Sequence, residues 1–221
     1  MKRALLLVGL AGCKAESVGV EVPRGGPDAI RMEDLRRDAF LLEGQKSSRQ
    51  AGVSRPAAAW TSLTDRLRQM KTVPAFGRSY RSTPDVPVVC SRKDGRSDTV
   101  LMVAVEDDPV APARSTAGLA MLISLAKAWD TRRPPAKTIL FCAWEGADGF
   151  AAFASAPPVP IERIEQAWVL GGLSRKGAHE RWLEPVPLSV AERVDGLDFV
   201  ALQASTRVFE AVIREAVSAS P

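Results

Sequence analysis

The sequence contains one histidine, His179, and no G-x-S-x-G motif in its 221 residues. A serine hydrolase needs a histidine base beside its nucleophilic serine. Ser115 and Ser174 have only His179 to recruit, and His179 follows the polar stretch "SRKGA", which is typical of an exposed loop. The sequence therefore argues against serine catalysis.

The chain also lacks a long basic block, an internal repeat and an apolar run long enough to span a bilayer. The formal net charge is +4 and the pI is about 9.2, but the arginines are scattered and form no long basic block with interleaved aromatic residues. We therefore expect no nucleic-acid partner. A hydrophobic content of 46% and a charged content of 25% are typical of a soluble domain with a sizeable core.

Cysteine is scarce as well, with only Cys13, Cys90 and Cys142. Cys90 and Cys142 lie in runs typical of buried strands, where a free cysteine behaves as a small hydrophobic residue. The two could pair in an oxidising compartment. We interpret them as unpaired thiols of the core.

The amino-terminal stretch "MKRALLLVGLAGCKAES" has two basic residues, an apolar run over 4–10 and then Leu10-Ala11-Gly12-Cys13. This order resembles a bacterial lipoprotein signal, in which small residues precede the cysteine that receives the lipid. The resemblance implies a signal peptide over 1–12 and a mature chain that begins at lipidated Cys13. Lys14 does not match the aspartate rule for inner-membrane retention, so we expect a cell-envelope protein, lipid-anchored in the outer membrane and facing the periplasm.

Other interpretations of this stretch stay open. The apolar run is shorter than a usual signal core, which also suits a buried strand or a misassigned start codon. A phosphate-binding loop fits poorly, because Lys14 stands where the G-x-x-x-x-G-K-[ST] motif needs its second glycine.

Downstream, residues 13–27 mix small, polar, Gly and Pro residues without a period, which predicts a lipidated tether before a single domain over 28–221. Apolar periodicity predicts four helices, over 28–44, 54–71, 115–129 and 204–217. Asp28 is expected to cap the first helix and Gly44 to end it, and Ser115 is expected to cap the third. Apolar runs predict strands over 134–146 and 165–174, and a hairpin over 86–108 that turns at Lys93-Asp94-Gly95. Because strands alternate with helices, we expect an α/β fold, a three-layer α/β/α sandwich with a mixed, mostly parallel sheet.

The block from about 86 to 175 carries, in order, "AVEDD", "ARSTAGLAMLISLAKAW", "TILFCAWEGADGF" and "AWVLGGLSR". This order resembles the core of the zinc-dependent aminopeptidase family, which also contains glutaminyl cyclases, glutamate carboxypeptidase and the transferrin receptor ectodomain. Its members carry A-H-x-D, G-A-x-D-N-x-S-G, F-x-x-[FW]-x-x-E-E-x-G and N-x-D-x-x-G. The resemblance rests on order and spacing, and it implies a truncated version of that fold.

Most functional positions of the family carry residues here that cannot perform its zinc chemistry. The first zinc-binding histidine falls on Val105, although its supporting aspartate is kept as Asp107. The remaining positions are the zinc-bridging aspartate at or next to Arg114, the general base at Ala147, the metal-binding glutamate at Asp148 just after Glu145, and a further zinc-binding aspartate at Gly171.

A two-metal hydrolytic site needs several imidazoles and carboxylates and a base for the bridging water. The methyl group of Ala147 cannot accept a proton, and His179 aligns with no ligand position. The resemblance therefore implies a catalytically inactive lipoprotein that binds or scaffolds a peptide or protein, without a cofactor and attached to the membrane through Cys13.

An active metallo-aminopeptidase or related metallohydrolase, with zinc in a rebuilt site, is the alternative, so enzymatic activity is left open. Such a site would draw on Glu106, Asp107, Asp108 and Asp148. The competing interpretation is a solvated acidic strand end with a salt bridge to Arg114. Trp144 suits the core, or the mouth of the old cleft where it could contact a peptide.

Overall fold

A computed structural model describes residues 26–43, 54–70, 72–82, 88–131, 133–170, 183–186 and 196–219. Its elements are, in chain order, η1 (Pro27–Ala29), α1 (Met32–Glu43), α2 (Ala57–Arg68), β1 (Val73–Pro74), β2 (Val88–Lys93), β3 (Val100–Asp107), α3 (Pro112–Ala128), β4 (Thr138–Glu145), α4 (Gly146–Ser155), η2 (Ile161–Arg163), β5 (Ile164–Leu170), β6 (Leu183–Val186) and α5 (Phe199–Ser218). No helix in these ranges is long and apolar enough to cross a membrane.

The strands form one mixed six-stranded sheet in the order β1-β2-β4-β3-β5-β6. β1, β2 and β4 pair antiparallel, whereas β4, β3, β5 and β6 pair parallel. The expected hairpin over 86–108 is wrong, because β4 lies between β2 and β3 and pairs with both. β4 is an apolar central strand that needs a pairing partner on each side. The β-branched runs on either side of Asp94-Gly95 do not reveal that β4 lies between β2 and β3.

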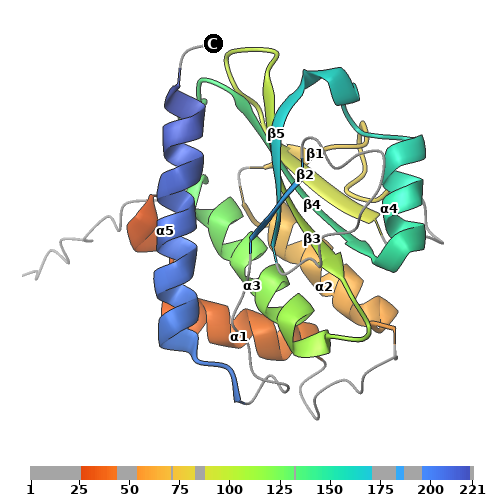
Figure 1. Ribbon diagram of the computed structural model, residues 1–221, viewed down its shortest axis with the longest axis vertical. Helices are drawn as coiled ribbons and strands as arrows, with labels where there is room; N and C mark the ends of the chain where they lie inside the picture. The colour runs from red at the N-terminus through yellow and green to blue at the C-terminus, as the bar shows by residue number, and fades with distance from the viewer. Residues whose placement is uncertain are drawn as a thin grey trace, which may run out of the picture.

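Alternate residues of the central strands enter two separate cores. Leu101, Val103 and Val105 of β3 face a large core that also contains side chains of α1, α2, α3 and α5. Met102 and Ala104 face a smaller core that includes Phe153 of α4. Figure 1 shows α3 and α5 on one side of the sheet and α4 on the other. The expected α/β/α sandwich is therefore confirmed.

The expected helices are present with shifted starts. Asp28 lies in η1, and α1 begins at Met32 instead of at residue 28. α3 begins at Pro112, and Ser115 is no cap, since its Oγ accepts from the amide of Asp108 at 2.8 Å inside the first turn. Proline suits a first helical position because its missing N–H would have no partner there.

α3 lies very close to the sheet because residue 118 has no side chain. A Cβ atom on Gly118 would lie 3.1 Å from the carbonyl oxygen of Leu170 and 3.2 Å from Cγ1 of Val105. These distances are tighter than ordinary van der Waals contact. Glycine at this position therefore sets the spacing between the helix and strands β3 and β5.

Cys90 and Cys142 form a disulfide, which contradicts the expectation of two free thiols. They are register partners on the antiparallel strands β2 and β4, with Cα atoms 4.2 Å apart. Both side chains face the smaller core. The sequence does not show that β2 pairs with β4, so local patterns could not bring the two sulfurs together.

Candidate functional site

Two acidic residues end neighbouring parallel strands at one edge of the sheet. Asp107 is the last residue of β3, Glu145 is the last residue of β4, and the two are register partners. Ligands of open α/β sheets bind beyond the carboxyl ends of the strands. A ligand site is therefore expected at this edge.

Arg55 reaches this edge from the segment directly before α2, and its side chain is only 1% exposed. Nε of Arg55 lies 2.9 Å from Oδ2 of Asp107, and Nη2 lies 3.0 Å from Oδ1. The guanidinium group thus binds both oxygens of one carboxylate, which is the strongest geometry for such a pair.

The other donors of Arg55 are also used. Nη2 donates to Oγ1 of Thr116 at 2.9 Å, and Nη1 donates to the carbonyl of Leu42 at 2.8 Å. Nη1 also lies 3.5 Å from Oε2 of Glu43. Every N–H of the guanidinium group therefore has an acceptor, as burial of a permanent cation requires.

Two further hydrogen bonds complete this network. The hydroxyl of Thr116 donates to Oε2 of Glu43 at 2.8 Å, and the backbone amide of Arg55 donates to Oε1 of Glu145 at 3.1 Å. We call these five residues, Glu43, Arg55, Asp107, Thr116 and Glu145, the Arg55 cluster. It brings one cation and three carboxylates together from α1, the segment before α2, α3 and the ends of β3 and β4.

Sequence reasoning missed Arg55, Glu43 and Thr116. The only local feature of Arg55 is its place before Pro56, which favours an extended backbone ahead of a helix. That feature says nothing about burial. We expected a salt bridge from Arg114, but the arginine that the structure shows bound to Asp107 is Arg55, and Arg114 is half-buried on α3.

The other candidate residues lie apart from the Arg55 cluster. Val105 is fully buried in the core under α3, and Ala147 and Asp148 are exposed on α4. Asp108 accepts a hydrogen bond from the amide of Val110 in the turn before α3. Cys13, Gly171 and His179 lie outside the described residues.

Trp144 is 1% exposed and packs on Phe153, with ring centroids 5.2 Å apart. It lies in the smaller core with Phe153. The described geometry therefore gives it a packing role and not a place at the mouth of a cleft.

The described residues do not fit a zinc centre. Among them no group of three His, Cys, Asp or Glu side chains is placed to hold a metal ion. Both oxygens of Asp107 are engaged by Arg55, whose positive charge is permanent and repels a dication. We therefore derive no chemical step through a metal at this edge.

Solved structures reveal what this fold resembles. A Zn-dependent exopeptidase from Parabacteroides distasonis has a TM-score of 0.59 at 10% identity, covering 87% of this chain and 99% of that chain. The glutaminyl cyclase of Macrostomum lignano has a TM-score of 0.59 at 12% identity, covering 88% of this chain and 92% of that chain. The chain has the fold of the zinc exopeptidases.

LapB from Legionella pneumophila shares this fold, with a TM-score of 0.58 at 10% identity over 87% of this chain and 74% of that chain. No protein-family model and no curated protein matches the sequence. At such low identity the likeness to zinc exopeptidases concerns the fold alone, and the chemistry has to be argued from the residues present.

Proposed function

We propose that this chain is a catalytically inactive protein of the zinc-exopeptidase fold that acts as a binding or scaffolding protein in the bacterial cell envelope. The Arg55 cluster carries the proposal. At the sheet edge where this type of fold binds ligands, Asp107 forms an ion pair with a buried arginine, 1% exposed.

The chemistry of that cluster supports a structural role. A guanidinium group cannot lose a proton at physiological pH and cannot act as a Lewis acid. It neutralises the carboxylate of Asp107, so that this residue is not available as a base or a metal ligand. The residue at the position of the family's general base, Ala147, has no proton acceptor in its side chain.

Envelope attachment is the second part of the proposal. In it, residues 1–12 are a signal peptide, Cys13 carries the lipid, and residues 13–27 tether the domain over 28–221 to the outer membrane. The Cys90–Cys142 disulfide supports this, because disulfides persist in oxidising compartments such as the periplasm. Several acyl chains on Cys13, at about 0.8 kcal/mol for each buried CH₂, would hold the protein firmly on a membrane.

Metal content tests the catalytic part. We would purify the full chain carrying Cys13→Ser without chelator, offer it zinc, and measure the bound metal by mass spectrometry. The proposal expects less than about a tenth of an equivalent. One or two equivalents that Asp107→Asn or Asp148→Asn removes would overturn it and indicate a rebuilt metal site.

The attachment part needs a separate measurement, which is the intact mass of the mature protein extracted from membranes. The proposal expects Cys13 as the first residue, with a mass increment of several acyl chains. The Cys13→Ser chain is the control and should carry no lipid. An unprocessed amino terminus in the parent protein would contradict this part and leave the metal result unaffected.

A further inference from the structure

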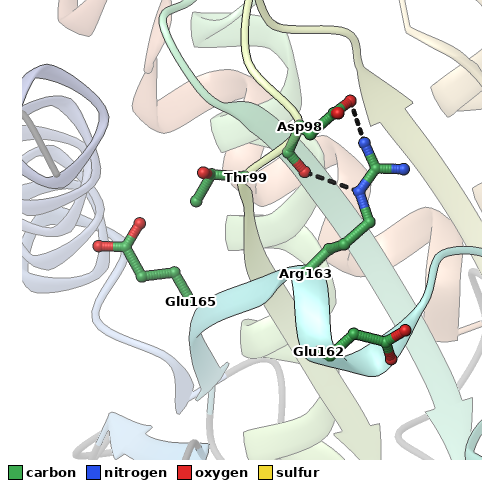
Figure 2. A pocket seen from close by; sticks show the side chains of 5 residues that line it. All are labelled: Asp98, Thr99, Glu162, Arg163 and Glu165. Carbon is green, nitrogen blue, oxygen red and sulfur yellow. Dashed lines mark hydrogen bonds and ion pairs between the residues drawn. The ribbon is translucent and has the colours of Figure 1, made fainter.

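Among the residues that the structure describes, two surface hollows away from the Arg55 cluster can be compared. Figure 2 shows the smaller hollow, which is lined by Asp98, Thr99, Glu162, Arg163 and Glu165. Its charges are largely paired already, since Arg163 bonds Asp98 and Lys137 bonds Glu165. The second hollow has a volume of about 570 Å³ and lies between α2 and the segment over 74–81, which begins at the last residue of the edge strand β1.

This second hollow, which we call the arginine groove, is strongly basic. Arg68, Arg78 and Arg81 line it with Asp65 as the one acidic lining residue, which leaves an excess of two positive charges. Thr61 and Thr64 of α2 also line it, and their hydroxyls donate to the carbonyls of Ala57 and Trp60. The groove shares no residue with the Arg55 cluster.

Neighbouring side chains hold two of the arginines in place without using all of their donors. Arg68 lies over the ring of Tyr80, 5.8 Å from its centroid, and Nη1 of Arg68 is 2.8 Å from Oδ1 of Asp65. Nη2 of Arg81 donates to Oγ1 of Thr61 at 3.1 Å. Each guanidinium group has five N–H donors, so both keep donors for a ligand.

Arg78 differs from the other two. It is exposed, at the turn closed by the bridge between Phe76 and Ser79. In the described part of the chain, Arg78 has no hydrogen bond or ion pair with another residue. An anion bound in the groove would therefore gain hydrogen bonds from Arg78 as well as from the two anchored arginines.

We propose that the arginine groove binds the phosphate group of an anionic ligand. The planar guanidinium fork matches the oxygens of phosphate, and a dianionic phosphate balances the two excess positive charges. A volume of about 570 Å³ accepts a small phosphorylated molecule or a lipid headgroup. This site goes beyond the proposed scaffolding function and does not depend on it.

Titration with inorganic phosphate tests the site directly. The full chain carrying Cys13→Ser is titrated at constant ionic strength, with chloride as the replaced anion, and amide NMR shifts report binding. We expect saturable binding that Arg78→Gln with Arg81→Gln weakens about tenfold or more, because two charge-assisted contacts are lost. Asp65→Asn should strengthen binding, since it removes the negative charge of the groove.

Matched variants separate the groove from general charge effects. Arg92→Gln removes a half-buried arginine that pairs with exposed Asp94 outside the groove, at 2.7 Å, and should leave phosphate affinity unchanged. Arg78→Lys with Arg81→Lys keeps both positive charges but loses the planar guanidinium groups, and it should give intermediate affinity. An unchanged thermal midpoint in each variant shows that the fold is intact.

Vesicles identify the source of the phosphate group. Binding to phosphatidylglycerol vesicles, but not to phosphatidylcholine vesicles, that disappears with the double glutamine variant indicates a lipid headgroup. Binding of inorganic phosphate without binding to either vesicle indicates a soluble ligand. Absence of saturable phosphate binding, or equal affinity in the groove variant and in Arg92→Gln, would overturn the proposal.

Discussion

Arg55 and Asp107 stand 52 residues apart in the chain, and their side chains form a two-contact ion pair with distances of 2.9 Å and 3.0 Å. Both groups are fully enclosed, with side-chain exposures of 1% and 0%. The pair joins the segment directly before α2 to the end of β3. Between the two residues the chain runs through α2, β1 and β2, so the pair is a direct link between segments that are distant in sequence.

We expect Arg55→Met to lower the free energy of unfolding by about 3–5 kcal/mol, because it leaves Asp107 buried without its cation. Urea unfolding measures the change. Arg92→Gln is the matched control, since it breaks an exposed ion pair and should cost about 1 kcal/mol or less.

A double variant separates the contribution of the buried charges to the free energy of unfolding from the contribution of side-chain packing. Arg55→Met combined with Asp107→Leu removes both charges and should recover part of the loss, because an apolar pair replaces a buried ion pair at little cost. If Arg55→Met alone cost no more than Arg92→Gln, the pair would be solvated in solution and the Arg55 cluster would not be a closed network.

We expect Cys90→Ala with Cys142→Ala to lower the free energy of unfolding by about 2–4 kcal/mol, because the disulfide restricts the unfolded chain over a separation of 52 residues. Urea unfolding with and without dithiothreitol measures this. Reductant should destabilise the parent protein and leave the double variant unchanged. If the unfolding of the parent protein did not change with reductant, and two free thiols could be titrated in it, the disulfide would not be formed.

We expect the ionisation of Asp34 in α1 to make the free energy of unfolding depend on pH. Burial raises the pKa of Asp34, whereas the hydrogen bond and charge of Lys127, and then Arg37, lower it and outweigh burial, so that it lies below the usual 3.8. A carboxylate with a lowered folded pKa stabilises the fold above its unfolded pKa, and that contribution disappears as the pH falls through the folded pKa.

Comparison with Asp34→Asn measures this contribution. The parent should be more stable by about 1 kcal/mol or less above about pH 5, since Lys127 is 36% exposed and solvent screens the pair. The difference should shrink below about pH 4 and with added salt. A difference that grows as the pH falls would mean that Lys127 and Arg37 do not hold the carboxylate in its charged form.

The fold class followed from the sequence to a large extent. The period of apolar residues in α3 and the continuous apolar run of β4 predicted both elements, because burial leaves a direct trace in the order of residues. Strand pairing was harder. β2 and β3 were expected to form a hairpin and instead flank β4, since hydrogen bonding between distant strands leaves no local trace.

The candidate site was predictable only in part. The resemblance to the family's motifs singled out Asp107 and Glu145, and the structure places both at the last positions of neighbouring parallel strands. The sequence did not single out Arg55, which lies in a stretch of small and polar residues and becomes buried only when α1, α3 and the strand ends surround it. Charge alone favours an exposed position for arginine, and only specific acceptors reverse that preference.

The sequence by itself determined the alternation of strands and helices and the composition of the core, because these depend on the spacing of apolar side chains along the chain. The tertiary structure alone decided that Cys90 meets Cys142, that Arg55 meets Asp107, and that Arg68, Arg78 and Arg81 line one groove. Each of these contacts lies between elements that the strand order of the sheet or the packing of the helices brings together. Contacts across such distances depend on how the whole chain packs, and no short stretch of residues encodes them.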